Sequence, residues 1–349
     1  MMKLRFWKCD LQLAHRWAIA SGTSQGSKVN QIIIVELTDD DGIVGIGEAA
    51  PARTYNETPE DVLAFCAKVD GQRLSFEDPA GGTAYVAGLS AHDMAAKCAF
   101  NIALVDGAAR RARKPIYDYL GLGFRENHHV TSFSIGIDTP DVIRTKVLEA
   151  ERYPVLKLKV GDVNEVANLA ALRAVAPTKP VRVDANEGWK TKEQALERAE
   201  WLARDGNIQF IEQPMPRTTP AKDLVWLKER SPLELVADES YHNESDIPFC
   251  AECFHGVNVK LVKTGGISVA YSALQAARRV KLKTMIGCMI ESSVLITAAA
   301  HLAELTDYLD IDGNLLINND PYLGVTAEKG ILSFANALDP IGLRVTKRG

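Results

Sequence analysis

Residues 155–160 read Val-Leu-Lys-Leu-Lys-Val, an apolar run that carries two lysines toward its carboxyl end. Short apolar runs of the same kind, each followed by a helical pattern, recur along the rest of the chain. The charged residues at their ends are Lys157, Asp184, Glu212, Asp238 and Lys263, at intervals of 27, 28, 26 and 25 residues. A strand–helix unit repeated at such a length predicts parallel strands joined by helical crossovers.

Eight such runs are present between residue 131 and residue 312. They are residues 131–136, 155–160, 181–184, 208–212, 235–238, 257–263, 283–287 and 308–312. Eight strand–helix units close into a (β/α)8 barrel. We therefore expect an α/β protein in which residues 123–318 form a barrel that carries the active site.

The first 122 residues have a different pattern, that of an α+β domain. Residues 31–37 are strongly β-branched, and Asp41-Gly42 predicts a turn into a second hairpin strand at 43–48. Thr58, Pro59 and Asp61 predict the start of a helix through a capping box, and a second helix is expected at about 93–113. Residues 319–349 show no further strand–helix unit, so we expect them to pack back on the N-terminal domain.

Composition and charge exclude several classes of protein. An apolar fraction of 46% and a charged fraction of 24% are those of an ordinary soluble globular protein. The net charge of −5 and the absence of a basic stripe speak against nucleic-acid binding. No apolar run has the roughly 18 residues of a membrane helix, and charges interrupt the N-terminus where a signal peptide would be apolar. We expect a cytoplasmic protein.

Two short motifs suggest chemistry that their surroundings do not support. Cys250-Ala-Glu-Cys253 lacks the second pair of ligands that a zinc site requires. Gly45-Ile-Gly47-Glu-Ala-Ala50 resembles a dinucleotide-binding pattern, but it lies in a hairpin strand and is followed by Pro51. Because no strand leads through a tight turn into a helix there, we predict no nucleotide site.

The charged residues at the strand ends predict a metal site. Charges inside buried strands are costly unless they are paired or bound to a metal, and each alone could be a buried salt bridge. Together, however, they share one register at the carboxyl ends of the strands, where barrel enzymes have their active sites. Three carboxylates on adjacent strands offer only oxygen ligands, which suit Mg²⁺ or Mn²⁺. We predict one divalent ion held by Asp184, Glu212 and Asp238.

The lysines predict proton transfer at a carbon next to a carboxylate. In a ring of eight strands the second and the sixth are opposite, so Lys159 and Lys263 would face each other across the barrel mouth. Two bases on opposite sides of one atom can move a proton from one face of a carbon to the other. The metal would bind the substrate carboxylate and stabilise the enediolate, while Lys157 and the metal would lower the pKa of a lysine base.

Five ordered motifs resemble those of the enolase superfamily, in its muconate-lactonizing subgroup. They are Lys157-Leu-Lys159-Val-Gly161, Val183-Asp184-Ala-Asn186, Ile211-Glu212-Gln213-Pro214, Ala237-Asp238-Glu239-Ser240 and Lys260-Leu-Val-Lys263-Thr-Gly-Gly266. The resemblance implies that the N-terminal domain caps the barrel and that the three acids are metal ligands. It also implies that Lys159 and Lys263 are the acid/base pair, and that Asn186, Gln213 and Glu239 support the ligands.

A motif after the eighth strand points to one reaction within this subgroup. Asp310-Ile-Asp312 is similar to the Asp-x-Asp of dipeptide epimerases, which binds the α-ammonium group of the substrate. The resemblance also places Ser134, Lys157, Met289 and Glu291 among the substrate contacts. The expected activity is Mg²⁺-dependent inversion of the α-carbon of the C-terminal residue of a dipeptide, by 1,1-proton transfer between two lysines.

The side chains of the dipeptide stay open. Ala-Glu epimerases carry an arginine in the N-terminal loop, whereas residues 21–27 contain none, so a different dipeptide is an equal candidate. Alternatives in the same subgroup are an N-acylamino-acid racemase, o-succinylbenzoate synthase and muconate cycloisomerase, whose substrates lack a free α-ammonium group. A barrel used only for binding would be expected to lose a lysine or a metal ligand. A homo-oligomer is compatible with the sequence, which does not determine the oligomeric state.

Overall fold

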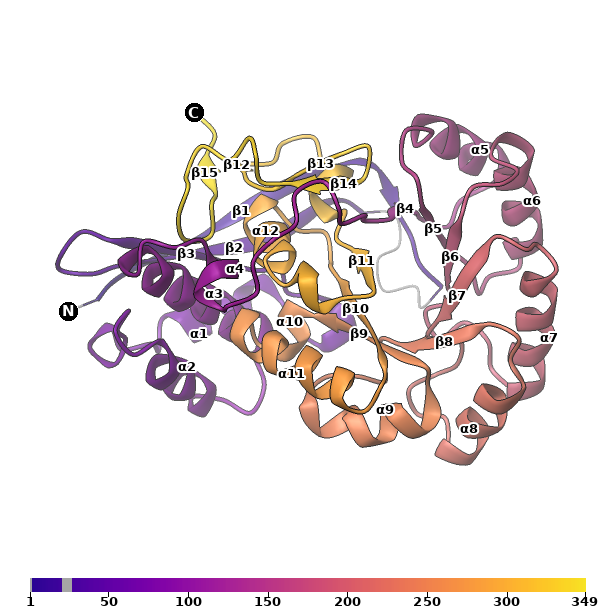
Figure 1. The fold of residues 1–349 in the computed structure, drawn as a ribbon, viewed down its shortest axis with the longest axis horizontal. Coiled ribbons are helices and arrows are strands. Elements are labelled where there is room, and N and C mark those ends of the chain that lie inside the picture. Colours follow the sequence, from indigo (N-terminus) through magenta and orange to yellow (C-terminus); the bar gives the residue numbers. More distant parts are fainter. Residues whose placement is uncertain (1, 21–26) are drawn as a thin grey trace.

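Eight parallel strands form a closed ring in the computed structural model, which describes residues 2–20 and 27–349 (Figure 1). Their order in the sheet follows the sequence, and a bridge between Thr131 and Leu309 joins the last strand to the first. The strands are β4 (Phe133–Ile135), β5 (Leu156–Lys159), β6 (Val181–Asp184), β7 (Ile208–Glu212), β8 (Glu234–Ala237), β9 (Gly256–Lys260), β10 (Lys283–Gly287) and β11 (Tyr308–Asp310). The predicted eight-stranded barrel is confirmed.

Helices follow the strands and cover the outside of the ring (Figure 1). They are α5 (Pro140–Glu149), α6 (Glu165–Val175), α7 (Lys192–Ala203), α8 (Ala221–Arg230), α9 (Ile247–Cys253), α11 (Ile267–Arg279) and α12 (Ser293–Ala300). Local sequence signals begin several of them: the Thr191 side chain accepts a hydrogen bond from the Gln194 backbone at the start of α7. Among the described residues, no helix is both long and apolar enough to cross a membrane.

The sixth barrel strand is shorter than the sequence predicts. β9 ends at Lys260, and the chain then forms one helical turn, α10 (Leu261–Thr264), which stops at Gly265 in the left-handed conformation (φ 93°). The prediction that the strand reaches Lys263 is therefore wrong, because the backbone turns out of the sheet once Lys260 has paired with Gly287. Lys263 lies one helical turn beyond the strand end.

The N-terminal domain consists of an antiparallel sheet with helices packed on it. Its strands are β1 (Lys3–Trp17), β2 (Ser27–Thr38) and β3 (Val44–Ala49), and its helices are α1 (Pro59–Cys66), α2 (Pro79–Gly88), α3 (Met94–Arg111) and α4 (Ile116–Tyr119). The predicted capping box of Thr58 and Asp61 is present at the start of α1. A Cβ atom on Gly45 or Gly47 would lie only 2.1 or 1.9 Å from a carbonyl oxygen of α3, so these glycines serve close packing.

The N-terminal domain is joined to the sixth barrel unit through α3. The Asn101 side chain donates a hydrogen bond to Ser268 Oγ (2.6 Å) and accepts one from the Ser268 backbone (3.1 Å) at the start of α11. A Cβ atom on Gly266, which has φ 127°, would lie 2.4 Å from the Asn101 Cβ. The two domains therefore meet at van der Waals distance beside α10.

The C-terminal segment contacts both domains. It forms two small antiparallel pairs, β12 (Tyr322–Leu323) with β15 (Thr346–Lys347) and β13 (Thr326–Glu328) with β14 (Ile331–Ser333). The Leu343 backbone donates to Asp106 of α3 (2.7 Å), and the Thr131 backbone donates to Gly330 (2.9 Å). This segment lies near the strands of the N-terminal domain in Figure 1. The domain boundaries at 122 and 318 stay predictions.

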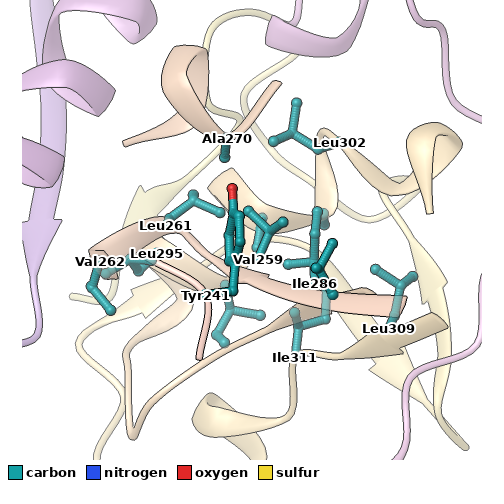
Figure 2. Close-up of a cluster of buried hydrophobic side chains, with 14 of the residues drawn as sticks. Tyr241, Val259, Leu261, Val262, Ala270, Ile286, Leu295, Leu302, Leu309 and Ile311 are labelled. Carbon is teal, nitrogen blue, oxygen red and sulfur yellow. The ribbon is translucent and has the colours of Figure 1, made fainter. Parts of the chain in front are cut away.

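Strand alternation separates the packed outside of the barrel from its polar interior. Val259, Ile286 and Leu309 belong to a buried apolar cluster with residues of α11 and α12 (Figure 2). Asn258 and Lys260, on either side of Val259, point the other way and reach carboxylates on β7 and after β8. The same alternation therefore places these two polar side chains inside the ring.

Candidate active site

Three carboxylates meet inside the carboxyl end of the barrel. Asp184 and Glu212 are the last residues of β6 and β7 and are paired in register, and Asp238 follows β8 directly. One carboxylate oxygen from each lies within 4.8 Å of the others, and all three side chains are fully buried. The structure thus brings together the three residues that the sequence predicts as metal ligands.

The electrostatics of this group fit a small divalent cation. Glu212 Oε2 and Asp238 Oδ2 are buried without a hydrogen-bond partner in the described residues, although lysines lie at ion-pair distance. Burial and the charge of Asp184 raise the pKa of Glu212 to about 7. Burial opposes ionisation of Asp238, but Lys260 and Lys263 hold its pKa well below the usual range. The donors are all carboxylate oxygens, which Mg²⁺ and Mn²⁺ prefer.

Lys157 occupies the middle of the barrel and is almost completely buried. Its ammonium lies 3.0 Å from Asp184 Oδ2, 2.7 Å from Glu212 Oε2 and 2.6 Å from Asp310 Oδ2. Burial alone would lower the pKa of Lys157. The charges of Asp310 and Glu212 outweigh this effect and hold the pKa well above its ordinary value. Lys157 therefore links the carboxylate group to the Asp310 side of the ring, a role that its prediction as a substrate contact did not include.

Lys159 and Lys260 occupy equivalent positions on opposite strands. Each is the last residue of its strand, β5 and β9, the second and sixth of the ring. Lys159 Nζ lies 2.6 Å from Asp184 Oδ2, and Lys260 Nζ lies 2.8 Å from Asp238 Oδ2. Lys260 was not predicted as a site residue from the sequence. Its alternation with Asn258 was the available signal, because two residues on one strand that are two apart share a face.

Lys263 has surroundings different from those of the other lysines. Its ammonium donates hydrogen bonds to the backbone oxygen of Asp238 (2.7 Å), to Asp238 Oδ1 (2.6 Å) and to the backbone oxygen of Asn258 (3.1 Å). Its side chain is fully buried. The Asn258 side chain, also missed from the sequence, donates to Glu212 Oε1 (2.8 Å). Lys263 is thus placed behind Asp238.

The predicted supporting residues hold the loops that follow the strands. The Asn186 backbone donates to Asp184 Oδ1 (2.9 Å), and its side chain donates to Glu239 Oε1 (3.2 Å). Gln213 Oε1 accepts from the Asp238 backbone (3.0 Å). Asn186 and Gln213 both have positive φ angles, 40° and 35°, so the chain turns sharply after β6 and β7. These contacts orient Asp184 and Asp238.

The two aspartates of the Asp-x-Asp motif differ from each other. Asp310 ends β11 and accepts from Ser132 Oγ and from Lys157, both at 2.6 Å. Burial opposes its ionisation, but Lys157 lowers the pKa of Asp310 to about 2. Asp312 accepts from the Ser134 backbone (2.6 Å), and burial together with the charge of Asp310 raises its pKa to about 7. In the described chain Asp312 has no cation within 4.0 Å, so it can accept one from outside.

The remaining predicted substrate contacts lie in the loop after β10. The Met289 backbone donates to Glu291 Oε1 (2.8 Å), and Met289 Sδ lies 3.9 Å from Lys260 Nζ. Burial and the charge of Glu48 raise the pKa of Glu291 well above its usual range. Glu291 is therefore turned toward its own loop, while Met289 borders Lys260. Most of the N-terminal loop at residues 21–27, considered above for its lack of an arginine, lies outside the described residues.

Two family models match the chain. The model described as "Mandelate racemase / muconate lactonizing enzyme, N-terminal domain" matches residues 9–121. The model described as "Enolase C-terminal domain-like" matches residues 143–325. Together they cover both the N-terminal domain and the barrel, in the order that the fold shows.

Relatives resemble the chain over almost its whole length. An L-Ala-D/L-amino acid epimerase from Pedosphaera parvula is 67% identical, over 99% of this chain and 99% of its own. An L-Ala-D/L-Glu epimerase from Bacteroides thetaiotaomicron is 37% identical, over 98% of this chain and 88% of its own. The crystal structure of a dipeptide epimerase from Cytophaga hutchinsonii, complexed with Mg and the dipeptide D-Ala-L-Val, matches with a TM-score of 0.90 and 25% sequence identity. The match covers 100% of this chain and 96% of that one. The chain therefore belongs to the mandelate racemase / muconate lactonizing enzyme family of the enolase superfamily, and it is an isomerase that stands among the epimerases.

Proposed function

We propose that this protein is a dipeptide epimerase that inverts the α-carbon of the C-terminal residue of its substrate. The observation that carries the proposal is that Lys159 and Lys260 lie on opposite strands, with the three carboxylates between them. Asp312 follows β11, the last strand of the ring. A reaction that moves a proton from one face of a carbon to the other requires two such groups. The names of the relatives support the same reaction.

Asp184, Glu212 and Asp238 would hold one Mg²⁺, or Mn²⁺, which has the same preference for oxygen ligands. When bound, the ion supplies positive charge that binds the substrate carboxylate and stabilises the negative charge developing there. Mg²⁺ in the related dipeptide epimerase structure supports this proposal. Asn186, Gln213 and Asn258 would keep the three ligands in place through the hydrogen bonds described above.

The acid/base pair in this proposal is Lys159 and Lys260, in place of the Lys159 and Lys263 that the sequence suggests. One lysine, as the neutral amine, takes the α-proton from one face, and the other, as the ammonium, returns a proton to the opposite face. For the reverse reaction the roles exchange. Lys260 suits this role because it ends its strand opposite Lys159, whereas Lys263 uses its donors behind Asp238.

Asp312 would bind the α-ammonium group of the dipeptide. It is a buried carboxylate next to Ser134, and no described cation neutralises it. Asp310 would contribute its charge, although Lys157 already pairs with it. A charged hydrogen bond to an ammonium is a strong selection for a free amino group. An N-acylated amino acid would leave the Asp312 carboxylate buried without a partner.

The substrate class that we propose is L-Ala-L-Xaa, with a broad choice of the second residue. The support is the relative from Pedosphaera parvula, which is 67% identical and is an L-Ala-D/L-amino acid epimerase. The loop at 21–27 has no arginine to select a glutamate side chain. We therefore expect uncharged second residues to be used at least as well as glutamate.

A library of L-Ala-L-Xaa dipeptides in D₂O tests the function. Mass spectrometry should show one deuterium at the C-terminal residue, and chiral analysis should show both epimers. With Lys159→Ala or Lys260→Ala, epimerisation should stop, while one epimer of each pair still exchanges its α-hydrogen. Lys222→Ala, an exposed change on α8, is the control and should behave like the unmodified protein. Faster turnover of N-acetyl or N-succinyl amino acids than of any dipeptide would reject the proposal.

A further inference from the structure

We propose that Lys263 is a positioning residue that, together with Asn258, fixes which oxygens of Asp238 and Glu212 are presented to the metal. The inference rests on the proposed function in one respect, that Asp238 and Glu212 are metal ligands. It assigns Lys263 a role in metal binding and removes it from proton transfer.

The hydrogen bonds of Lys263 leave it no means to exchange a proton with a substrate. A lysine ammonium has three N–H donors. Lys263 has three acceptors within 3.1 Å: the backbone oxygen and Oδ1 of Asp238, and the backbone oxygen of Asn258. Its side chain has no exposed surface. A lysine that exchanges a proton with the substrate would need at least one hydrogen-bonding position of its nitrogen to face the barrel mouth.

Lys260 provides the contrast on the same carboxylate. It lies 2.8 Å from Asp238 Oδ2, the other oxygen, and its side chain is 9% exposed. Asp238 Oδ2 has no hydrogen-bond partner among the described residues. Lys263 therefore fixes the orientation of the Asp238 carboxylate from behind and leaves Oδ2 facing the interior of the barrel.

Asn258 does the same for Glu212. Its side-chain amide donates to Glu212 Oε1, while Glu212 Oε2 stays without a hydrogen bond in the described chain. Gly287 on the neighbouring strand makes room for this amide, because a Cβ atom there would lie 2.6 Å from it. Lys263 also bonds the backbone oxygen of Asn258, so the two residues form one connected clamp. Each of the two ligands thus has one oxygen held by this clamp, while its other oxygen lies at ion-pair distance from a lysine at the barrel interior, Lys157 for Glu212 and Lys260 for Asp238.

Calorimetric titration of the metal-stripped full-length protein with Mg²⁺ tests the clamp without any dipeptide. Lys263→Met should weaken Mg²⁺ binding by about tenfold or more, as loss of a residue supporting a metal ligand does. Lys260→Met is the matched control, since it removes an ammonium from Oδ2 of the same carboxylate and leaves the three hydrogen bonds of Lys263 in place. It should leave the affinity unchanged or increase it. Lys263→Arg, which keeps charge and donors, should restore most of the affinity.

Hydrogen exchange at saturating Mg²⁺ provides a second measurement. In Lys263→Met, any fall in α-hydrogen exchange should be by the same factor for the two epimers, because both directions use the same metal. If Lys263→Met does not fold, the Lys263→Arg and Lys263→Gln variants are compared in the same two assays, with weaker Mg²⁺ binding expected for Gln. Equal Mg²⁺ affinity of the Lys263 and Lys260 variants, or loss of exchange for one epimer only, would overturn the inference. Failure of the unmodified protein to bind Mg²⁺ would instead refute the metal site of the proposed function.

Discussion

At the scale of single residues, Asp312 connects the chemistry of the site to pH. Burial and the neighbouring Asp310 raise the pKa of Asp312 to about 7, so the carboxyl is neutral below that pH and charged above it. Only the charged form attracts an ammonium group strongly. We predict that kcat/KM for free dipeptides falls as the pH drops through about 7, which initial rates between pH 5.5 and 8.5 will show.

Asp312→Asn tests this assignment. The variant keeps the shape but not the charge, so it should lower kcat/KM at pH 8 by about 1.5–3 kcal/mol, the range of a charged hydrogen bond. In this variant kcat/KM should also no longer fall as the pH drops through about 7. An unchanged pH profile in Asp312→Asn would show that another group titrates. Glu328→Gln, at an exposed position of β13, serves as the control.

At the scale of elements, the contact between β3 and α3 depends on two glycines. A Cβ atom on Gly47 would lie 1.9 Å from the Ala99 carbonyl oxygen, which belongs to a helix backbone and cannot move alone. Gly47→Ala should therefore lower the free energy of unfolding by at least about 1–3 kcal/mol, measured by urea denaturation. Gly88→Ala is the matched control, since nothing lies within 4 Å of its added Cβ. A loss as large in the control would contradict the steric explanation.

The elements also show what could be predicted from the sequence. The strands that end in Asp184 and Glu212 were predictable because alternation and a regular repeat are local properties of the chain. The end of β9 was not, because the turn of α10 depends on Gly265 and on packing against α3. The contacts of Lys157 with three carboxylates were also beyond prediction, since several buried acids compete for each lysine and only the folded geometry decides between them.

At the scale of the whole molecule, one aromatic cluster joins the N-terminal domain, the barrel and the C-terminal segment. Phe334 is fully buried, and its ring centroid lies 4.8 Å from that of Phe124, 5.5 Å from that of Tyr117 and 4.8 Å from that of His301. Phe334→Ala should lower the free energy of unfolding by about 3–5 kcal/mol, as for other buried phenylalanines. Circular dichroism and tryptophan fluorescence should report the same transition for both domains.

The control for this prediction comes from the same segment. Leu338 is 75% exposed, so Leu338→Ala should change the free energy of unfolding by less than about 0.5 kcal/mol. Two separate transitions in Phe334→Ala would contradict the expected single transition. A single transition at unchanged stability would show that Phe334 contributes no net packing energy.

The contact of Asn101 with Gly266 and Ser268 restricts how this protein can be recombined with its relatives. Gly266 has no room for a Cβ atom beside Asn101, and the Asn101 amide bonds Ser268 on the other domain. A chimera that takes its N-terminal domain from one parent and its barrel from another places residue 101 of the first parent against residues 266 and 268 of the second. Exchange of the two domains between relatives is therefore expected to succeed only when both parents have compatible residues at 101, 266 and 268.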